Sequence, residues 1–148
     1  MEFIPYKSEF LQYAEEIFDS NVPDFVGAEE KENLQFFLEK ETSELSYFIV
    51  FNENEAVGMC GYCFEKEKDE AVLCWGLLHR KHHLKKIGTK MLQFRIAEIK
   101  KISATAKIIC RTSQVTEGFF AKFGFKTFEA KENYWGEGLH LRSMILEE

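Results

Sequence analysis

The segment from residue 70 to residue 111 constrains the fold most. An apolar, strand-like run, DEAVLCWGLLH, ends at His79, and a helical pattern extends from Ile87 to about Ile102. A second strand-like run follows at 106–111. A strand, a crossover helix and a second strand in this order form a βαβ unit with parallel strands. The chain therefore contains a sheet with at least one parallel pair, and a loop that leads into the crossover helix.

Apolar periodicity places the other elements around this unit. Strands are predicted at 2–6, 46–52, 55–66, 125–131 and 139–147, and helices are predicted at 8–21, 27–41 and 114–123. The resulting order is β-α-α-β-β-β-α-β-α-β-β. We therefore expect an α+β fold, with a mixed sheet of about seven strands flanked by four helices, in a single domain that spans 1–148. This order is neither doubly wound nor that of a barrel.

Composition and charge exclude several classes of protein. The 148 residues carry a net charge of −6, which argues against a general nucleic-acid-binding protein. No run approaches the roughly 20 apolar residues of a membrane span, and no signal peptide is visible at the N-terminus. We therefore expect a cytoplasmic protein without nucleic-acid or membrane partners.

The four cysteines, at 60, 63, 74 and 110, lie in strand-like runs, which is typical of reduced core thiols. CGYC, residues 60–63, has the spacing of a redox or zinc motif. A redox pair needs a helix N-terminus, and a zinc site needs further ligands at suitable spacing; the sequence shows neither. We therefore expect no metal.

The loop before the crossover helix is strongly basic. HRKHHLKKIGTK, residues 79–90, holds five Lys or Arg residues, three His residues and no acid. The first turn of a helix has unpaired N–H groups and a partial positive charge, so this loop can form a site for a polyanion such as pyrophosphate. The alternative is a solvated turn that binds nothing. The glycine-rich motifs of nucleotide kinases and of dinucleotide-binding dehydrogenases are absent.

Two segments resemble motifs of the GNAT acetyltransferase superfamily. WGLLHRKHHLKKIGTKML, residues 75–92, resembles motif A, in which a strand leads through Arg/Gln-x-x-Gly-x-Gly/Ala into a helix. The family's Arg/Gln falls on His83, and its two glycines fall on Lys86 and Gly88. TSQVTEGFFAKFGF, residues 112–125, resembles motif B, and the order of elements agrees along nearly the whole chain.

The resemblance implies that acetyl is transferred from acetyl-CoA to a primary amine of a small molecule or protein, by direct attack in a ternary complex. The CoA diphosphate would bind backbone N–H groups of the loop, and the thioester carbonyl would meet the N–H near Leu78. The residues implied to bind acetyl-CoA are Leu77, Leu78, His79, His83, Leu84, Lys85, Lys86, Ile87, Gly88, Thr89, Ser113 and Phe120.

The acid and base of the reaction stay open. His79 can titrate near neutral pH and is the candidate catalytic base. The family's usual acid, a Tyr of motif B, is replaced by Phe120, and the first motif glycine is replaced by Lys86. These departures favour a second hypothesis, a catalytically weak GNAT-fold module that binds CoA as a sensor or regulator. The acceptor groove would lie between residues 21–27 and 134–140, where acidic surroundings favour a cationic acceptor. A homodimer is compatible with both hypotheses.

Overall fold

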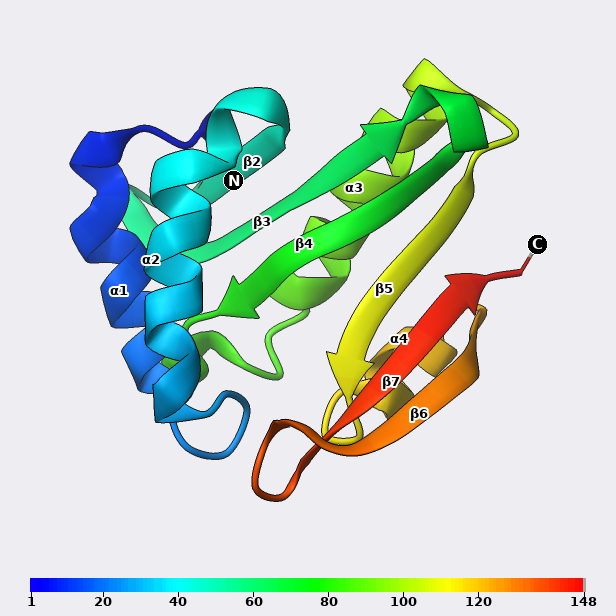
Figure 1. Ribbon diagram of the computed structural model, residues 1–148. Helices are drawn as coiled ribbons and strands as arrows, with labels where there is room; N and C mark the ends of the chain where they lie inside the picture. Colours follow the sequence, from blue (N-terminus) through cyan, green and yellow to red (C-terminus); the bar gives the residue numbers. More distant parts are fainter. Residues whose placement is uncertain (148) are drawn as a thin grey trace.

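The computed structural model describes residues 1–147 apart from the side chain of Glu44, so the last residue of the expected domain lies outside it. One sheet has the strand order β1-β2-β3-β4-β5-β7-β6 (Figure 1). The strands are β1 Glu2–Pro5, β2 Ser46–Asn52, β3 Glu55–Glu65, β4 Glu70–Leu78, β5 Lys107–Ser113, β6 Phe125–Gly136 and β7 Leu139–Leu146. The α-helices are α1 Leu11–Ser20, α2 Lys31–Lys40, α3 Ile87–Ile102 and α4 Glu117–Ala121.

Strand directions confirm the expected α+β fold with a mixed seven-stranded sheet and four helices. All neighbouring strands are antiparallel except β4 and β5, which are parallel. The parallel pair is the one that the βαβ pattern predicted, with α3 as its crossover helix.

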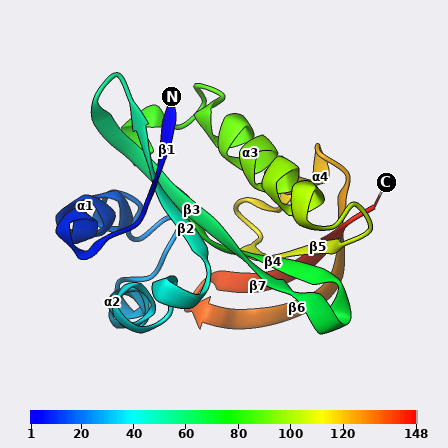
Figure 2. The same ribbon diagram turned by 90° about the horizontal axis from the view of Figure 1, so that it is seen from above.

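The helices cover both faces of the sheet. α1 and α2 lie on one face, and α3 and α4 lie on the other (Figure 2). Phe18 and Leu34 are fully buried in the first layer, and Leu92 and Ile99 are fully buried in the second. Full burial of a side chain of this size contributes about 1.5–3 kcal/mol to folding. In the part of the chain that the structure describes, no helix is long and apolar enough to cross a membrane.

The ends of several elements differ from the predicted ones. The helices predicted at 8–21 and 27–41 each begin with one 3₁₀ turn, so that their α-helical parts start later. β6 continues to Gly136, beyond its predicted end at residue 131. The β2–β3 hairpin turns as predicted at Glu53 and Asn54, which both have positive φ, as a two-residue turn of this kind requires.

The cysteines are all free thiols, but they are not all in the core. Cys60 and Cys110 are buried, whereas Cys63 is exposed, because Cys60 and Cys63 point to opposite faces of β3. Among the described residues, no three His, Cys, Asp or Glu side chains gather closely enough to hold a metal ion.

β4 bends and separates from β5 before it ends. The two strands pair only over 70–72 and 107–109. Farther along β4, Trp75 has a φ of 34°, and the register with β3 shifts between Met59 and Gly61. Such a bulge bends the strand and interrupts the hydrogen-bond ladder. Figure 1 shows β4 and β5 diverging toward the end of the molecule where β4 enters the basic loop.

Candidate functional site

Four segments lie toward the lower end of the molecule in Figure 1: the end of β4, the basic loop, the α1–α2 connection and the β6–β7 hairpin. Hydrogen bonds tie the end of α1 to the first two of these segments. The Asn21 side-chain amide donates to the Leu78 carbonyl at 3.1 Å, and the Arg80 N–H donates to Ser20 Oγ at 3.1 Å. The bend itself is held by the Tyr47 hydroxyl, which donates to the carbonyl of Trp75 at 2.7 Å.

The basic loop has an unusual backbone. It contains one 3₁₀ turn, Arg80–His82, followed by Leu84 with a φ of 68° and Lys86 with a φ of 63°. Residues other than glycine are strained in this left-handed region. Lys86 replaces the first motif glycine, so the loop keeps a glycine-like backbone without a glycine. Leu84 is fully exposed, so no burial of its side chain offsets the strain.

We expect Leu84→Gly to raise the free energy of unfolding by about 0.5–1 kcal/mol, because glycine removes the strain at positive φ and no burial is lost. Chemical denaturation of the two proteins measures this difference. Leu84→Val is the matched control, since a β-branched side chain should lower stability at the same position. A less stable Leu84→Gly protein would contradict the left-handed backbone at Leu84.

The first turn of α3 offers backbone donors. The N–H groups of Ile87, Gly88 and Thr89 lie in this turn, where they have no intrahelical acceptor. His83 differs, because its N–H donates to the Arg80 carbonyl at 3.1 Å and its ring Nε2 donates to the Leu78 carbonyl at 2.9 Å. The predicted N–H donors of residues 87–89 thus lie together at the start of α3. The two N–H groups of His83 already donate to backbone carbonyls of the chain itself.

Part of the positive charge in the loop is already paired. The ion pairs are Arg80–Asp24, at 2.6 Å, and Lys81–Glu55. Within residues 1–147, no carboxylate lies at ion-pair distance from Lys85 or Lys86. These two lysines directly precede α3, so they remain available to an anion at its N-terminus.

His79 uses its acceptor nitrogen inside the loop. Its Nδ1 accepts the N–H of Lys81 at 3.2 Å and so caps the 3₁₀ turn. Burial lowers the pKa of His79, and the nearby charges of Lys81 and His82 lower it further. The ring is therefore neutral at physiological pH, but its lone pair is occupied by a backbone donor. In this arrangement His79 has no free lone pair with which to take a proton from a substrate.

The end of β4 directs a backbone donor away from β3. The His79 N–H donates to the Val57 carbonyl at 2.7 Å. Because N–H directions alternate along an antiparallel ladder, the N–H of Leu78 points away from β3, toward the side from which β5 has departed. Leu77, the preceding residue, is half-buried against the cluster under α1 and α2. Leu78 is thus oriented as the predicted contact to a thioester carbonyl requires.

Ser113 and Phe120 lie across the divergence, after β5. Ser113 Oγ accepts the backbone N–H two residues farther on, at 3.2 Å, and closes the turn before α4. Phe120 packs edge-to-face on Phe125, with ring centroids 5.5 Å apart. Phe119, rather than Phe120, faces α3, because a Cβ on Gly88 would lie 3.7 Å from its ring.

A cavity of about 510 Å³ opens at the β4 bend between α2 and the β6–β7 hairpin. It is lined by Glu29, Glu30, Asn33, Trp75, Asn133, Tyr134, Trp135 and Gly136. Carboxylates and aromatic rings thus surround a space that reaches Trp75. The expected acceptor groove coincides with this cavity at the hairpin, but its other wall comes from residues 29–33 and not from 21–27.

Glu30 is the buried acid of this cavity, with 8% of its surface exposed. Burial raises the pKa of Glu30; the Gly27 N–H, 3.2 Å from its Oε2, opposes this effect, and the charge of Glu29 adds to it. Glu29 is exposed and lies against Gly27 and Gly136, so it bridges the α1–α2 connection and the hairpin. Neither acid stands out in the sequence, because Glu in the first turn of a helix is ordinary.

The hairpin wall of the cavity is fixed by contacts from β5. The Arg111 guanidinium lies 5.3 Å from the centroid of the Tyr134 ring, and Trp135 Nε1 donates to the Thr112 carbonyl at 3.0 Å. Contacts from β5, which lies beyond β7 in the sheet, therefore position both aromatic residues at the tip of β6, although Tyr134 stays partly exposed to solvent.

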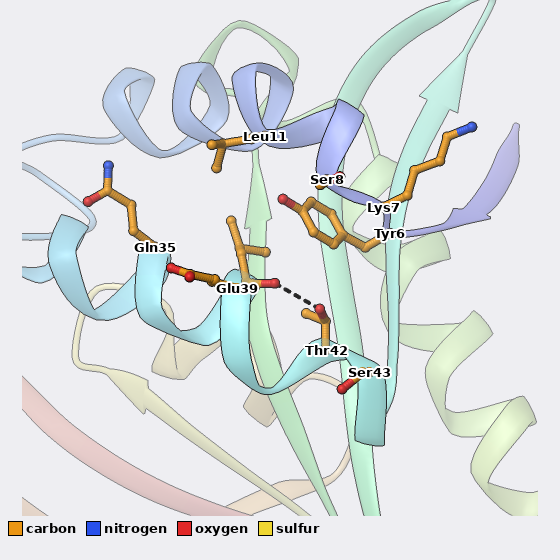
Figure 3. Close-up of a pocket in the computed structure, with 9 residues that line it drawn as sticks. Tyr6, Lys7, Ser8, Leu11, Gln35, Glu39, Thr42 and Ser43 are labelled. Atoms are coloured by element: carbon orange, nitrogen blue, oxygen red, sulfur yellow. Dashed lines mark hydrogen bonds between the residues drawn. The ribbon is translucent and has the colours of Figure 1, made fainter.

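A second cavity, of about 640 Å³, lies between the start of α1 and the end of α2 (Figure 3). It is lined by Tyr6, Lys7, Ser8, Leu11, Gln35, Leu38, Glu39, Thr42 and Ser43. The Thr42 hydroxyl donates to the Leu38 carbonyl at 2.9 Å, so the end of α2 already satisfies this group. No lining residue comes from the basic loop, the β4 bend or the hairpin, so this cavity is separate from the candidate site.

Comparison with known proteins places the chain among acetyltransferases. Residues 14–125 match the model of the Acetyltransferase (GNAT) family. The chain therefore belongs to the GNAT family, as its two motifs indicated. Among curated protein sequences, none matches the chain significantly.

Solved structures share the fold at low sequence identity. The ribosomal-protein-S18-alanine N-acetyltransferase of Escherichia coli superposes with a TM-score of 0.77 at 16% identity, over 98% of this chain and 92% of that one. An N-acetyltransferase from Staphylococcus aureus Mu50 superposes with a TM-score of 0.75 at 15% identity, over 99% of this chain and 97% of that one. An aminoglycoside 6′-N-acetyltransferase complexed with coenzyme A superposes with a TM-score of 0.69 at 14% identity, over 98% of this chain and 96% of that one. Identities this low establish the shared fold and leave the substrate open.

Proposed function

We propose that this protein is an acetyl-CoA-dependent N-acetyltransferase that acts on the primary amine of a cationic small molecule or protein. The observation that carries the proposal is the cavity that brings Glu29 and Glu30 to Trp75, at the bend of β4. Carboxylates and aromatic faces both attract cations. The cavity is therefore suited to an ammonium group and adjoins the strand end where the resemblance puts the thioester.

The residues around the start of α3 fit acetyl-CoA. The Ile87, Gly88 and Thr89 N–H groups, with Lys85 and Lys86, would hold the diphosphate. Gly88 leaves the backbone open, because the nearest atom to a Cβ there would be in the Phe119 ring, 3.7 Å away. Acetyl-CoA would supply the acetyl group as a thioester, and the Leu78 N–H would donate to its carbonyl oxygen. The complex of a structural neighbour with coenzyme A supports this assignment.

In the proposed reaction the amine nitrogen attacks the thioester carbonyl. The new bond is C–N, and the bond that breaks is C–S, whose electron pair leaves on sulfur. An ammonium has no lone pair, so a base must first take one proton; we assign this role to Glu30, directly or through a water molecule. The nitrogen loses a second proton as the amide forms. One ammonium and one thioester thus give one amide, one thiol and one proton.

The decisive experiment measures release of the CoA thiol from acetyl-CoA across a panel of amines. Polyamines, aminoglycosides and lysine-bearing peptides should be acetylated, whereas amines that carry a carboxylate beside the amino group should react poorly. Mass spectrometry of the product identifies the acylated nitrogen. If CoA binds but no amine promotes thiol release, the CoA-binding regulatory module becomes the better assignment, which the replacements at Lys86 and Phe120 favour.

We expect CoA affinity to fall as salt rises, and Lys85→Ala/Lys86→Ala to weaken binding about tenfold at low salt while flattening the salt dependence. Exposed phosphate contacts are screened over about 8–10 Å at 0.1–0.15 M salt. Calorimetric CoA titrations at several salt concentrations measure both effects. Lys81→Ala is the control, because this lysine already pairs with Glu55 and should matter little. A double variant that binds like the wild type would refute the assignment of these lysines.

A further inference from the structure

Arg95 is a buried cation without a paired anion. It lies on α3 with only 4% of its surface exposed, and its Nε donates to the Met91 carbonyl at 3.3 Å. In the described part of the chain, no carboxylate lies at ion-pair distance from Arg95, and its two terminal nitrogens have no hydrogen-bond acceptor. Burial of an unpaired charge is costly. This arrangement therefore indicates a ligand that brings negative charge.

The free end of Arg95 lies at the β4 bend. A Cβ on Gly76, the residue after Trp75, would be 3.0 and 3.2 Å from its two terminal nitrogens. Among the described residues, no fully buried side-chain nitrogen lacks a partner, so both terminal nitrogens retain solvent-accessible surface. β4 has no pairing with β5 at this level. A small part of the guanidinium surface is thus open beside Gly76 at the bend, while the acceptor cavity meets the bend at Trp75.

Among the side chains that the structure describes around Arg95, none neutralises this charge. The titratable groups that face Arg95 are Tyr47 of β2, Cys60 of β3, Cys74 of β4 and Cys110 of β5. Burial raises the pKa of all four, to about 12 for Cys74 and Cys110, although the charge of Arg95 lowers it. All four are neutral at physiological pH. Arg95 thus already favours the ionised form of thiols on both diverging strands.

We propose that Arg95 is a catalytic residue that stabilises the CoA thiolate leaving during acetyl transfer. This inference rests on the proposed function. When the C–S bond breaks, sulfur takes the electron pair and a negative charge, and Phe120 has no proton to give. The guanidinium at the bend would attract this charge directly, so the thiolate can leave unprotonated and take a proton from solvent after release.

The pKa of the bound CoA thiol tests the proposal. Thiolate absorbance is titrated for protein loaded with CoA and for protein loaded with desulfo-CoA, and the difference removes the contribution of the protein's own cysteines. A free thiol has a pKa of about 8.5, and an opposite charge within about 4–6 Å lowers such values by about 1–3. We expect the pKa of the bound CoA thiol to lie below about 8.5 in the wild type and at or above about 8.5 in Arg95→Met. In Arg95→Lys this pKa should be intermediate.

Arg95→Met should fold, because an apolar residue of similar length replaces an unpaired buried cation. Thermal denaturation verifies this. With the best amine, kcat should fall about 10- to 100-fold and the KM for acetyl-CoA should change little.

An unchanged thiol pKa in a folded, CoA-bound Arg95→Met protein would overturn the proposal. Preference for succinyl-CoA over acetyl-CoA, lost in this variant, would overturn it too, because Arg95 would then bind an acyl carboxylate. A wild type that binds no CoA would overturn the proposed function itself.

Discussion

Gly88→Glu is expected to weaken CoA binding at least about 100-fold without unfolding the protein. Gly88 lies in the first turn of α3, where its N–H group has no intrahelical acceptor and the proposed diphosphate would lie against the backbone. A glutamate there places a side chain and a negative charge in the same space. The fold should persist, because an acid near a helix N-terminus interacts favourably with the helix dipole. Calorimetric CoA titration and circular dichroism measure the two properties.

Two substitutions at the same position separate size from charge. Gly88→Ala should be tolerated structurally, since its Cβ would contact the Phe119 ring at an ordinary 3.7 Å. Gly88→Gln has the length of glutamate without its charge. We expect affinity to decrease in the order Ala, Gln, Glu. If folded Gly88→Glu protein bound CoA like the wild type, the diphosphate could not lie at the start of α3.

The sequence was informative about the fold because the local signals agreed with one another. The apolar period of Ile87–Ile102 and the strand-like runs on either side could form only a crossover unit, and α3 has the predicted bounds. The bend of β4 could not be predicted, because the positive φ of Trp75 depends on contacts that the fold itself makes. One of these is the hydrogen bond from Tyr47, a residue of a distant strand.

The candidate site was only half predictable for the same reason. The basic loop is contiguous, so its charge, its glycine and its motif could be recognised in the sequence. The acceptor cavity joins residues from α2, β4 and β6, and no spacing in the sequence brings Glu30 near Trp75. In the sequence, His79 stands out as a candidate base because it lies at the end of the strand that leads to the cofactor loop and can titrate near neutral pH. Only the structure shows that its Nδ1 accepts a backbone N–H and that Glu30 is the buried acid of the cavity.

Glu30→Gln is expected to lower kcat by about 10²- to 10⁴-fold, the usual contribution of a well-placed general base. Burial raises the pKa of Glu30 above that of an ordinary carboxyl group. A base with a raised pKa takes a proton from an ammonium more readily, but it must itself be ionised to act. The wild-type rate should therefore fall as pH drops through this raised pKa, and this acidic limb should be absent from the residual activity of the variant. Steady-state kinetics across pH, with the best amine of the panel, measure both effects.

The raised pKa of Glu30 also predicts that Glu30→Gln does not destabilise the fold. A carboxyl whose folded pKa is raised stabilises the fold below its unfolded pKa, and this contribution is lost as pH rises and the buried group ionises. Glutamine stays neutral and can still accept the Gly27 N–H, so Glu30→Gln should be at least as stable as the wild type at neutral pH.

Glu29→Gln is the matched control: it removes the charge that helps to raise the pKa of Glu30, so it should move the acidic limb to lower pH and leave the base in place. A stable Glu30→Gln protein with wild-type turnover would exclude Glu30 as the base, and the amine would then have to lose its proton to water or to a group outside this cavity.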